Sequence, residues 1–350
     1  MPALKEAKVP FYKNMMLITD FNCGVANAQI ELRFQNVFLY TTQELAKGKL
    51  TNIDRRLKPA GWIEDYIYRE RPFVPTSIHN VPFGNIDFAA YANYTCYRAL
   101  GSNTRPNIFI HVTDPGVGFG KDRTILVTDE HNVFIGPNNG SLGLMARYFE
   151  SRGIGYTIYK IDIPFIEHLE RTRTGSPTYI LPHTFHGRDL FAVVAGLIAG
   201  GVHPESLALD EPDTILEPAY AQNISRLPSK VGQVARFQVF RDNTAGNIKT
   251  SFSIDQKSFD RIVAEGARYR ISKPNTAKFQ IPFLKRQMTF PAKNVFADMK
   301  AGEPLLYLGS TFAVNWDERF VELAINMGNA GQSLDVSPLH GAEMLIERIQ

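Results

Sequence analysis

The sequence predicts two domains, an N-terminal α/β domain with a mostly parallel sheet and a smaller C-terminal domain rich in β-strands. Three observations lead to this fold class. Short apolar runs alternate with helical patterns up to Gly200, residues 208–230 hold prolines and acids without a clear period, and strand-like pieces separated by turns follow. We therefore expect an N-terminal domain over 1–207, a linker over 208–230 and a C-terminal domain over 231–350.

The strands of the first domain are expected where brief apolar runs end at turn residues. The run Met15–Thr19 ends at Asp20, and the run Asn107–Thr113 ends at Asp114. Two more runs flank the polar turn 129–132, and a last one follows the first expected helix. These further strands are expected over 124–128, 133–135 and 156–161.

Two helices are expected from apolar periodicity. Large apolar residues at helical spacing predict a helix over 141–152, and a stretch rich in Ala, Val and Leu over 189–199 predicts another that stops at Gly200-Gly201. Residues from about 41 to 73 are polar and carry four arginines, so we expect an insertion there. In the second domain the expected strands lie over 233–240, 248–254, 268–271 and 304–308.

Composition and charge exclude several classes of protein. The 350 residues are 44% apolar and 21% charged, which is typical of a globular chain with real cores. The net charge of +3, without a dense basic run, argues against a general nucleic-acid binder. Only Cys23 and Cys96 are present, and the longest apolar runs are too short for a secretion signal or a membrane span. We therefore expect a soluble cytoplasmic protein.

Carboxylates at the ends of the first two strands are candidate binding groups. The carboxyl ends of parallel strands are where open α/β sheets bind ligands, and both Asp20 and Asp114 lie at such ends. A carboxylate can accept two hydrogen bonds from a vicinal diol such as that of ribose. The alternative is that each aspartate only caps its loop.

Two loops and one polar cluster add further candidates. The loops 114–118 and 136–140 combine proline and glycine with amides, which suits a bound polar ligand and ordinary turns equally well. The cluster 184–189 holds an imidazole, a guanidinium and a carboxylate before an apolar helix, and His186 could polarise a water together with Asp114. The alternative is a helix cap with one structural ion pair.

Other chemistries have little support in the sequence. His183 and His186 could contribute to a metal site, but a full ligand set such as HExxH is missing, and we expect no bound metal. There is no GxGxxG after the first strand, no GxxxxGK[ST] and no GxSxG. Dinucleotide, P-loop and serine hydrolase functions therefore lose their main support.

Seven segments in order resemble the S-adenosylmethionine hydrolase and halogenase family, which includes the fluorinases and chlorinases. The resemblance covers nearly the whole chain apart from the insertion. The segments are ITDF at 18–21, HNVP at 79–82, VTDPGVG at 112–118, FIGPNNG at 134–140, TFHGRD at 184–189, DNTAGNIKTS at 242–251 and VELAINMGNA at 321–330.

The resemblance implies both a fold and a reaction. The implied fold is an N-terminal α/β domain followed by a C-terminal β-barrel-like domain. The implied assembly is a homotrimer with active sites between the N-terminal domain of one subunit and the C-terminal domain of the next. The implied reaction is substitution at C5′ of the ribose of S-adenosylmethionine, which is a substrate, so no cofactor is expected. Because a sulfonium leaves as a neutral thioether, the enzyme mainly has to position a nucleophile.

By resemblance, the nucleophile is a water. The halogenases carry a non-acidic residue where this chain has Asp114, whereas the water-using branch carries DPGVG and FHGRD, as here. Asp114 and His186, with Arg123 as third member, would then hold the attacking water. A carboxylate beside a halide would repel it strongly. We therefore expect hydrolysis to adenosine and methionine.

The resemblance also implies substrate contacts. Asp20 matches the family's ribose-binding aspartate, while Asp242 and Asn247 match residues that meet the methionine ammonium group and the adenine. Phe83 is a candidate for the aromatic wall near the sulfonium. The backbone from Asn326 to Ala330 resembles the loop at the adenine edge, although a core or turn role would explain these last two features equally well.

The chain departs from the family pattern at four places. After Asp20 it has Phe21-Asn22-Cys23-Gly24-Val25, where the family usually has a glycine and then an acidic residue. Lys121 could occupy the place assigned to Arg123, and Ala245 stands where an aromatic residue is common. The 41–73 insertion has no derived role. The altered loop after Asp20 and Ala245 leave open a non-catalytic binding protein for S-adenosylmethionine or adenosine. Among enzymes, the alternatives are a halide-using adenosyl transferase, against which Asp114 and His186 argue, and, more distantly, a metal-dependent phosphoesterase built on His183 and His186.

Overall fold

Part of the chain is described by the computed structural model, and the fold below concerns only that part. Contacts between residues divide the chain into two units, each of which draws on separate stretches of sequence. The first consists of Met1–His79, Cys96–Asn139 and Ile154–Leu216, and the second of Asn80–Thr95, Gly140–Gly153 and Glu217–Gln350. The described residues are 12, 14–20, 24–47, 54–60, 74–78, 81–100, 106–113, 122–181, 185–212, 214–217, 219–242, 246–274, 287–314, 317–337 and 341–350.

A seven-stranded sheet forms the core of the first unit. Its strands lie in the order β2-β1-β3-β5-β4-β6-β7. The first four strands run parallel to one another, whereas β4 pairs antiparallel with both β5 and β6, and β7 pairs antiparallel with β6. The strands are β1 (Asn14–Thr19), β2 (Val74–Ile78), β3 (Ile108–Val112), β4 (Arg123–Thr128), β5 (Val133–Pro137), β6 (Tyr156–Ile161) and β7 (Ala208–Pro212).

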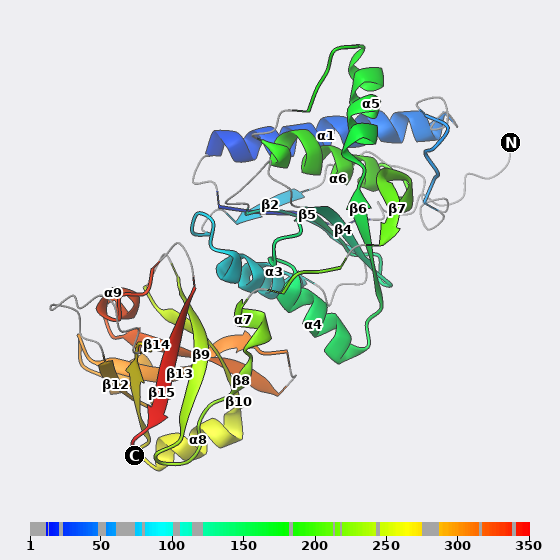
Figure 1. The fold of residues 1–350 in the computed structure, drawn as a ribbon. Coiled ribbons are helices and arrows are strands. Elements are labelled where there is room, and N and C mark those ends of the chain that lie inside the picture. The colour runs from blue at the N-terminus through cyan, green and yellow to red at the C-terminus, as the bar shows by residue number, and fades with distance from the viewer. Residues whose placement is uncertain are drawn as a thin grey trace, which may run out of the picture. The chain divides into compact units, whose positions relative to one another are not determined.

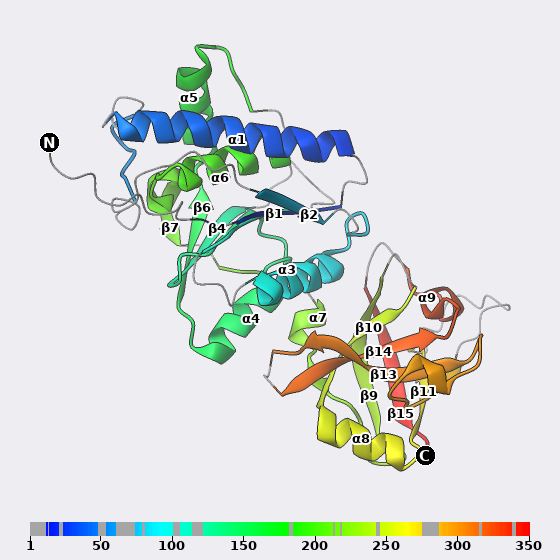
Figure 2. The ribbon, with the colours of Figure 1, turned by 180° about the vertical axis from the view of Figure 1, so that it is seen from behind.

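The helices α1 (Gly24–Ala46) and α6 (Ala192–Ala199) lie together on one face of this sheet (Figures 1 and 2). Every residue of α6 is buried, which explains its continuous apolar sequence. Gly196 allows the close approach, because a Cβ there would lie 2.8 Å from Cβ of Val37 and 2.9 Å from the carbonyl oxygen of Phe34. α5 (Ile163–Thr174) begins at Asp162, whose side chain caps it by accepting from the N–H of Phe165.

The second unit contains a nearly closed, barrel-shaped antiparallel sheet with strand order β12-β11-β15-β9-β10-β14-β13. The two ends of this path meet in a bridge between Ala292 and Leu306. The apolar faces enclose one core. The strands are β8 (Ser225–Arg226), which pairs with β10, β9 (Val234–Arg241), β10 (Ile248–Asp255), β11 (Arg268–Ser272), β12 (Gln287–Pro291), β13 (Pro304–Phe312), β14 (Glu318–Ile325) and β15 (Ala342–Arg348).

Short helices complete the chain. α4 (Gly143–Arg152), α7 (Ala219–Gln222), α8 (Gln256–Ala264), the 3₁₀ turn Phe296–Asp298 and α9 (Ala330–Ser333) belong to the second unit, and α3 (Ile86–Leu100) contributes residues to both units. The 3₁₀ turn Pro204–Leu207 precedes β7 in the first unit. Among the described helices, none combines the length and apolarity needed to cross a lipid bilayer.

These elements confirm the expected fold class. The expected strands of the first domain coincide with β1, β3, β4, β5 and β6 within two residues at each end, and the expected helices coincide with α4 and with the segment that ends in α6. Helices α1, α3, α5 and α8 are not among the elements expected from the sequence. The stretch expected as a linker holds two strands, since β7 joins the first sheet and β8 pairs with β10.

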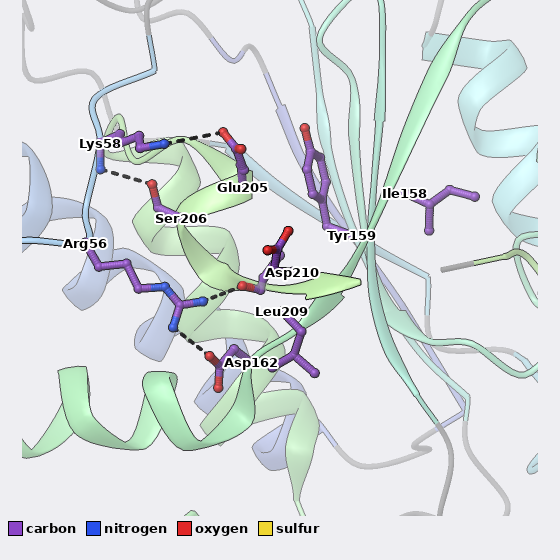
Figure 3. Close-up of a pocket in the computed structure, with 10 residues that line it drawn as sticks. Arg56, Lys58, Ile158, Tyr159, Asp162, Glu205, Ser206, Leu209 and Asp210 are labelled. Carbon is purple, nitrogen blue, oxygen red and sulfur yellow. Dashed lines mark hydrogen bonds and ion pairs between the residues drawn. The ribbon is translucent and has the colours of Figure 1, made fainter. Parts of the chain in front are cut away.

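The expected insertion is only partly described. Residues 41–46 continue helix α1, and residues 54–60 lie along the first unit, where the N–H of His203 donates to the carbonyl of Lys58 at 2.9 Å. This segment borders a cavity of about 700 Å³ (Figure 3). Charged groups around the cavity pair with one another, as Arg56 does with Asp162 at 2.6 Å and Lys58 with Glu205 at 3.8 Å. None of the expected site residues that the structure describes lines it.

Candidate active site

The end of β1 lies at a switch point of the first sheet. β1 pairs with β2 on one side and with β3 on the other, and open α/β sheets bind ligands outside the carboxyl ends of strands at such a point. Asp20 directly follows β1, is 6% exposed, and donates its N–H to the carbonyl of Val112 at 3.2 Å. The fold therefore brings Asp20 to the end of β3, where Thr113 precedes Asp114. Asp114 itself lies outside the described residues.

Arg123 and His186 form a nearly buried pair in the first unit. Arg123 is the first residue of β4, opposite Pro137 of β5, and is 3% exposed, while His186 is 5% exposed. Nε of Arg123 donates to Nδ1 of His186 at 3.2 Å. An accepting Nδ1 carries no proton, so the neutral ring in this arrangement has its hydrogen on Nε2. The pair thus joins a fixed positive charge to an imidazole N–H donor.

The backbone around His186 explains how the side chain is placed. His186 directly precedes a single π-helical turn, Gly187–Phe191, that leads into α6, and π turns of this kind are frequent at functional sites. Gly187 fits here because a Cβ would lie 3.0 Å from Cγ1 of Val112 and 3.1 Å from Cδ1 of Ile30. The imidazole meets the ring of Phe191 edge-on, with centroids 6.3 Å apart.

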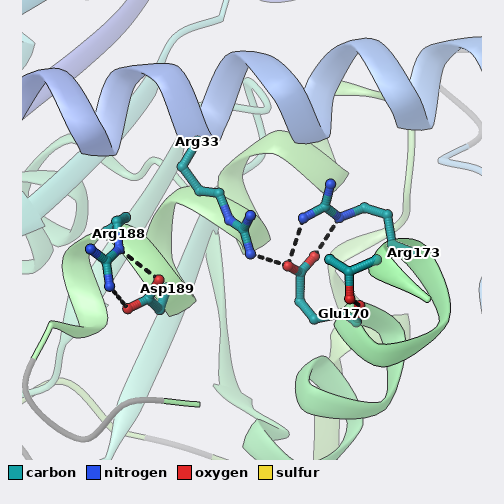
Figure 4. Close-up of polar contacts among 6 residues, drawn as sticks. Arg33, Glu170, Arg173, Arg188 and Asp189 are labelled. Carbon is teal, nitrogen blue, oxygen red and sulfur yellow. Dashed lines mark hydrogen bonds and ion pairs between the residues drawn. The ribbon is translucent and has the colours of Figure 1, made fainter. Parts of the chain in front are cut away.

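The other charged residues of the 184–189 cluster pair with each other. Nε and Nη2 of Arg188 donate to the two carboxylate oxygens of Asp189 at 2.7 and 2.6 Å (Figure 4). The guanidinium of Arg188 also lies 5.0 Å from the centroid of the Phe185 ring. The cluster read from the sequence therefore separates in space, with His186 joined to Arg123 and the neighbouring ion pair serving the structure.

A second ion cluster lies between α1 and α5. The carboxylate of Glu170 is 1% exposed and accepts two hydrogen bonds from Arg173, both at 2.7 Å, and one from Arg33 (Figure 4). One buried carboxylate thus neutralises part of the charge of two guanidinium groups and ties the two helices together.

The loop after β5 uses its amides to hold neighbouring backbone. Asn138 donates from Nδ2 to the carbonyl of Thr214 at 2.6 Å and accepts from the N–H of Leu216 at 3.0 Å. Asn139 donates from Nδ2 to the carbonyl of Thr113 at 2.5 Å. The amides of this loop therefore bond to protein, and Asn139 fixes the peptide that leads to Asp114.

Gly136 makes room for a buried histidine on the adjacent strand. A Cβ at Gly136 would lie 2.4 Å from both Cε1 and Nε2 of His111. His111 is 0% exposed, and desolvation by burial lowers the pKa of its ring to about 3. His111 is therefore neutral at physiological pH, and the glycine that the sequence assigned to a turn is required by packing.

The second unit brings Asp242 and Asn247 together in the hairpin loop between β9 and β10. The N–H of Asp242 donates to the carbonyl of Asn247 at 2.9 Å, and the N–H of Gly246 donates to Oδ1 of Asp242 at 2.9 Å. Gly246 has φ +69°, and a Cβ there would lie 2.3 Å from Cγ of Asn329. Only glycine combines this backbone conformation with such close packing. Ala245 lies outside the described residues.

A row of side chains that the sequence analysis missed supports Asn247. Its Nδ2 donates to the hydroxyl of Tyr307 at 3.2 Å, and that hydroxyl donates to Oε2 of Glu322. Nζ of Lys249 lies 2.7 Å from Oε1 of the same carboxylate. No local sequence signal links these residues, because the register of β10, β14 and β13 is what sets them side by side.

The remaining expected contacts also belong to the second unit. Asn326 donates from Nδ2 to the carbonyl of Met299 at 2.7 Å, so its amide holds a turn. Ala330 is buried at the start of α9, and the N–H of Gly331 donates to the carbonyl of Gly246 at 2.9 Å, which joins this helix to the hairpin loop. Phe83 is 62% exposed.

Three further candidates, Asp114, Lys121 and His183, lie outside the described residues. Within the described ranges, no group of three His, Cys, Asp or Glu side chains is arranged to hold a metal ion.

Comparisons with known proteins point to one family. Residues 69–208 match the model of the SAM hydroxide adenosyltransferase N-terminal domain, where SAM denotes S-adenosylmethionine. A protein of Thermus thermophilus named (R)-S-adenosyl-L-methionine hydrolase is 25% identical over 269 residues, which cover 75% of this chain and 84% of that protein. A protein of the same name from Methanocaldococcus jannaschii is 26% identical over 301 residues, which cover 85% of this chain and 89% of that protein.

Two solved structures share the fold. A crystal structure of an uncharacterized conserved protein from Thermotoga maritima has a TM-score of 0.56 at 22% identity, covering 95% of this chain and all of that one. A crystal structure of a conserved hypothetical protein from Thermus thermophilus has a TM-score of 0.52 at 18% identity, covering 96% of this chain and 99% of that one. At these identities the likeness concerns the fold alone.

Proposed function

Because the chain belongs to the SAM hydroxide adenosyltransferase family, we propose that it hydrolyses S-adenosylmethionine to adenosine and methionine. The observation that carries this proposal is the buried Arg123–His186 pair at the carboxyl edge of the first sheet. The pair combines a permanent positive charge with an imidazole N–H, and two relatives over most of the chain are named as hydrolases of this compound.

In the proposed reaction, a water oxygen attacks C5′ of the ribose as the C5′–S bond breaks. The bonding electron pair goes to sulfur, which leaves as the neutral thioether of methionine. The N–H at Nε2 of His186 donates to the attacking oxygen, Arg123 fixes the imidazole through Nδ1, and the carboxylate of Asp114 takes the proton that the water loses. Arg123 also stabilises the hydroxide character that the oxygen gains as its proton passes to Asp114.

The substrate is held at its three parts. In the trimer that the family resemblance implies, Asp20 of one subunit accepts hydrogen bonds from the ribose hydroxyls, while Asp242 and Asn247 of the next subunit meet the methionine ammonium group and the adenine, respectively. Phe83 lies along the sulfonium, and the backbone from Asn326 to Ala330 faces the edge of the base. The exposure of Phe83 and the hairpin that joins Asp242 to Asn247 support these assignments.

Neither a metal nor a cofactor takes part in this proposal. A sulfonium is already an activated leaving group, so no Lewis acid is required to remove it. We also propose that the protein acts as a homotrimer in the cytoplasm, as the family resemblance implies. Light scattering of the purified protein tests the trimer.

Chromatography of the protein incubated with S-adenosylmethionine tests the reaction. We expect adenosine and methionine in equal amounts, both in chloride buffer and in halide-free buffer. A halogenated nucleoside that forms only with halide would contradict a water nucleophile. Bound but unconsumed S-adenosylmethionine would instead identify a binding protein.

A further inference from the structure

Three side chains form a row across adjacent strands of the barrel-shaped sheet. The strand register places Glu322 of β14 opposite Lys249 of β10 and opposite Tyr307 of β13. Nζ of Lys249 lies 2.7 Å from Oε1 of Glu322, and the Tyr307 hydroxyl donates to Oε2. The residue Glu322 is 3% exposed, so this row is held inside the protein.

The row determines where the hydrogen of the Tyr307 hydroxyl points. The carboxylate of Glu322 is paired with a lysine and can only accept, so the hydroxyl hydrogen is committed to it. Desolvation by burial and the charge of Glu322 raise the pKa of Tyr307, which keeps that hydrogen in place. Toward its other neighbour, the hydroxyl oxygen can therefore only accept.

This commitment in turn orients the amide of Asn247. The atom of Asn247 that faces Tyr307 is Nδ2, at 3.2 Å, and a flipped amide would set two acceptors against each other. Oδ1 then lies on the opposite side of the amide group. Asn247 is half-buried, and the partly exposed ring of Phe296 meets the Tyr307 ring edge-on with centroids 5.0 Å apart. Tyr307 thus contacts both a partly exposed apolar ring and an amide of fixed polarity.

We propose that the row Lys249–Glu322–Tyr307 makes Asn247 selective for 6-aminopurines over 6-oxopurines. Oδ1 accepts a hydrogen from the 6-amino group, and the second hydrogen of Nδ2 is left for a ring nitrogen, as in bidentate amide recognition of adenine. A 6-oxo group would place an acceptor against Oδ1. The inference rests on the proposed function, which puts the adenine at Asn247, and Tyr307 acts as a positioning residue.

Binding of adenosine and inosine to the full-length protein, measured by calorimetry, tests this selectivity. We expect the wild type to prefer adenosine by roughly 10- to 100-fold. In Tyr307→Phe the amide is free to flip, so the preference should fall to about threefold or less, mainly through tighter inosine binding relative to adenosine. The matched control is Tyr269→Phe, which removes a buried hydroxyl that donates to the carbonyl of Pro228 at 3.0 Å in the same unit.

A second variant disturbs the row without removing the hydroxyl. A Cβ at Gly309 would lie 2.4 Å from Oε1 of Glu322, so Gly309→Ala displaces the carboxylate and should lower the preference in the same direction. Equal affinity of the wild type for the two nucleosides would overturn the inference. So would an unchanged preference in Tyr307→Phe, or an equal loss in Tyr269→Phe. Hydrolysis is scored separately, so a protein that discriminates the nucleosides but consumes no S-adenosylmethionine contradicts only the proposed function.

Discussion

Arg123 holds Nδ1 of His186 through Nε at 3.2 Å, although 63 positions separate the two residues in the chain. One residue starts the strand antiparallel to β5, and the other precedes the π turn into α6. Neither position carries a local signal for the other. The contact fixes the face that the imidazole presents, and the proposed chemistry depends on it.

Replacing either member of this pair should abolish most of the activity. For His186→Ala and Arg123→Met we expect the kcat for hydrolysis of S-adenosylmethionine to fall by about 10²- to 10⁴-fold, because proton transfer and orientation of the water are lost. The measurement is initial rates by chromatography. His168→Gln is the control, since that histidine is half exposed and pairs with Asp54 at 3.1 Å. Activity near wild type in His186→Ala would refute the site assignment.

His111 should make stability depend on pH. Its folded pKa, about 3, lies below the ordinary 6.5, so the unfolded chain binds the extra proton between these values and stability falls as pH falls through this window. Between pH 7 and pH 5 this group alone should cost about 2 kcal/mol. Denaturant unfolding of wild type and His111→Gln at several pH values measures the difference, and parallel pH dependences would rule it out. His131 and His203, whose pKa values burial also lowers, contribute equally to both proteins.

The contact of Gly136 with His111 should appear as a coupling between two substitutions. Gly136→Ala alone should destabilise the protein by about 1–3 kcal/mol, because the new methyl group overlaps the imidazole. In the double variant with His111→Ala the overlap with the ring is gone, while the approach of 2.5 Å to the carbonyl oxygen of residue 111 stays, so the added methyl group should cost less than in the single variant but still destabilise the protein. A double-mutant cycle from denaturant unfolding measures the coupling. Strict additivity would show that the two residues do not compete for the same space.

Glu170 of α5 should contribute more to the stability of the protein than Glu44 of α1, which forms a surface ion pair. Glu170→Gln leaves Arg33 and Arg173 partly buried without their counter-charge, and we expect a loss of about 3 kcal/mol in the free energy of unfolding. Glu44→Gln, which breaks a surface pair with Lys47, should cost about 0.5 kcal/mol or less. A similar small loss for both variants in chemical denaturation would contradict the role given to Glu170.

The pattern of short apolar runs was enough to predict the fold class and the positions of β1, β3, β4, β5 and β6. β3 and β5 are buried along their whole length, and β1 is buried after its first residue, so a short apolar run closed by turn residues is enough to identify them. α1 was missed because its buried face is interrupted by polar residues and its main partner, α6, is distant in sequence. The composition of 208–230 suggested a linker, yet β7 and β8 acquire strand structure only through pairing with distant strands.

The sequence by itself determined which residues could carry the chemistry, and the tertiary structure decided how those residues are used. Residue types and spacing singled out His186, Arg188 and Asp189 as one cluster, because spacing reports proximity along the chain. Folding divided them, since the π turn directs the imidazole to Arg123 while the adjacent guanidinium and carboxylate neutralise each other. The support for Asn247 came from strand register alone, which is set by the burial of whole sheet faces and has no counterpart in local sequence.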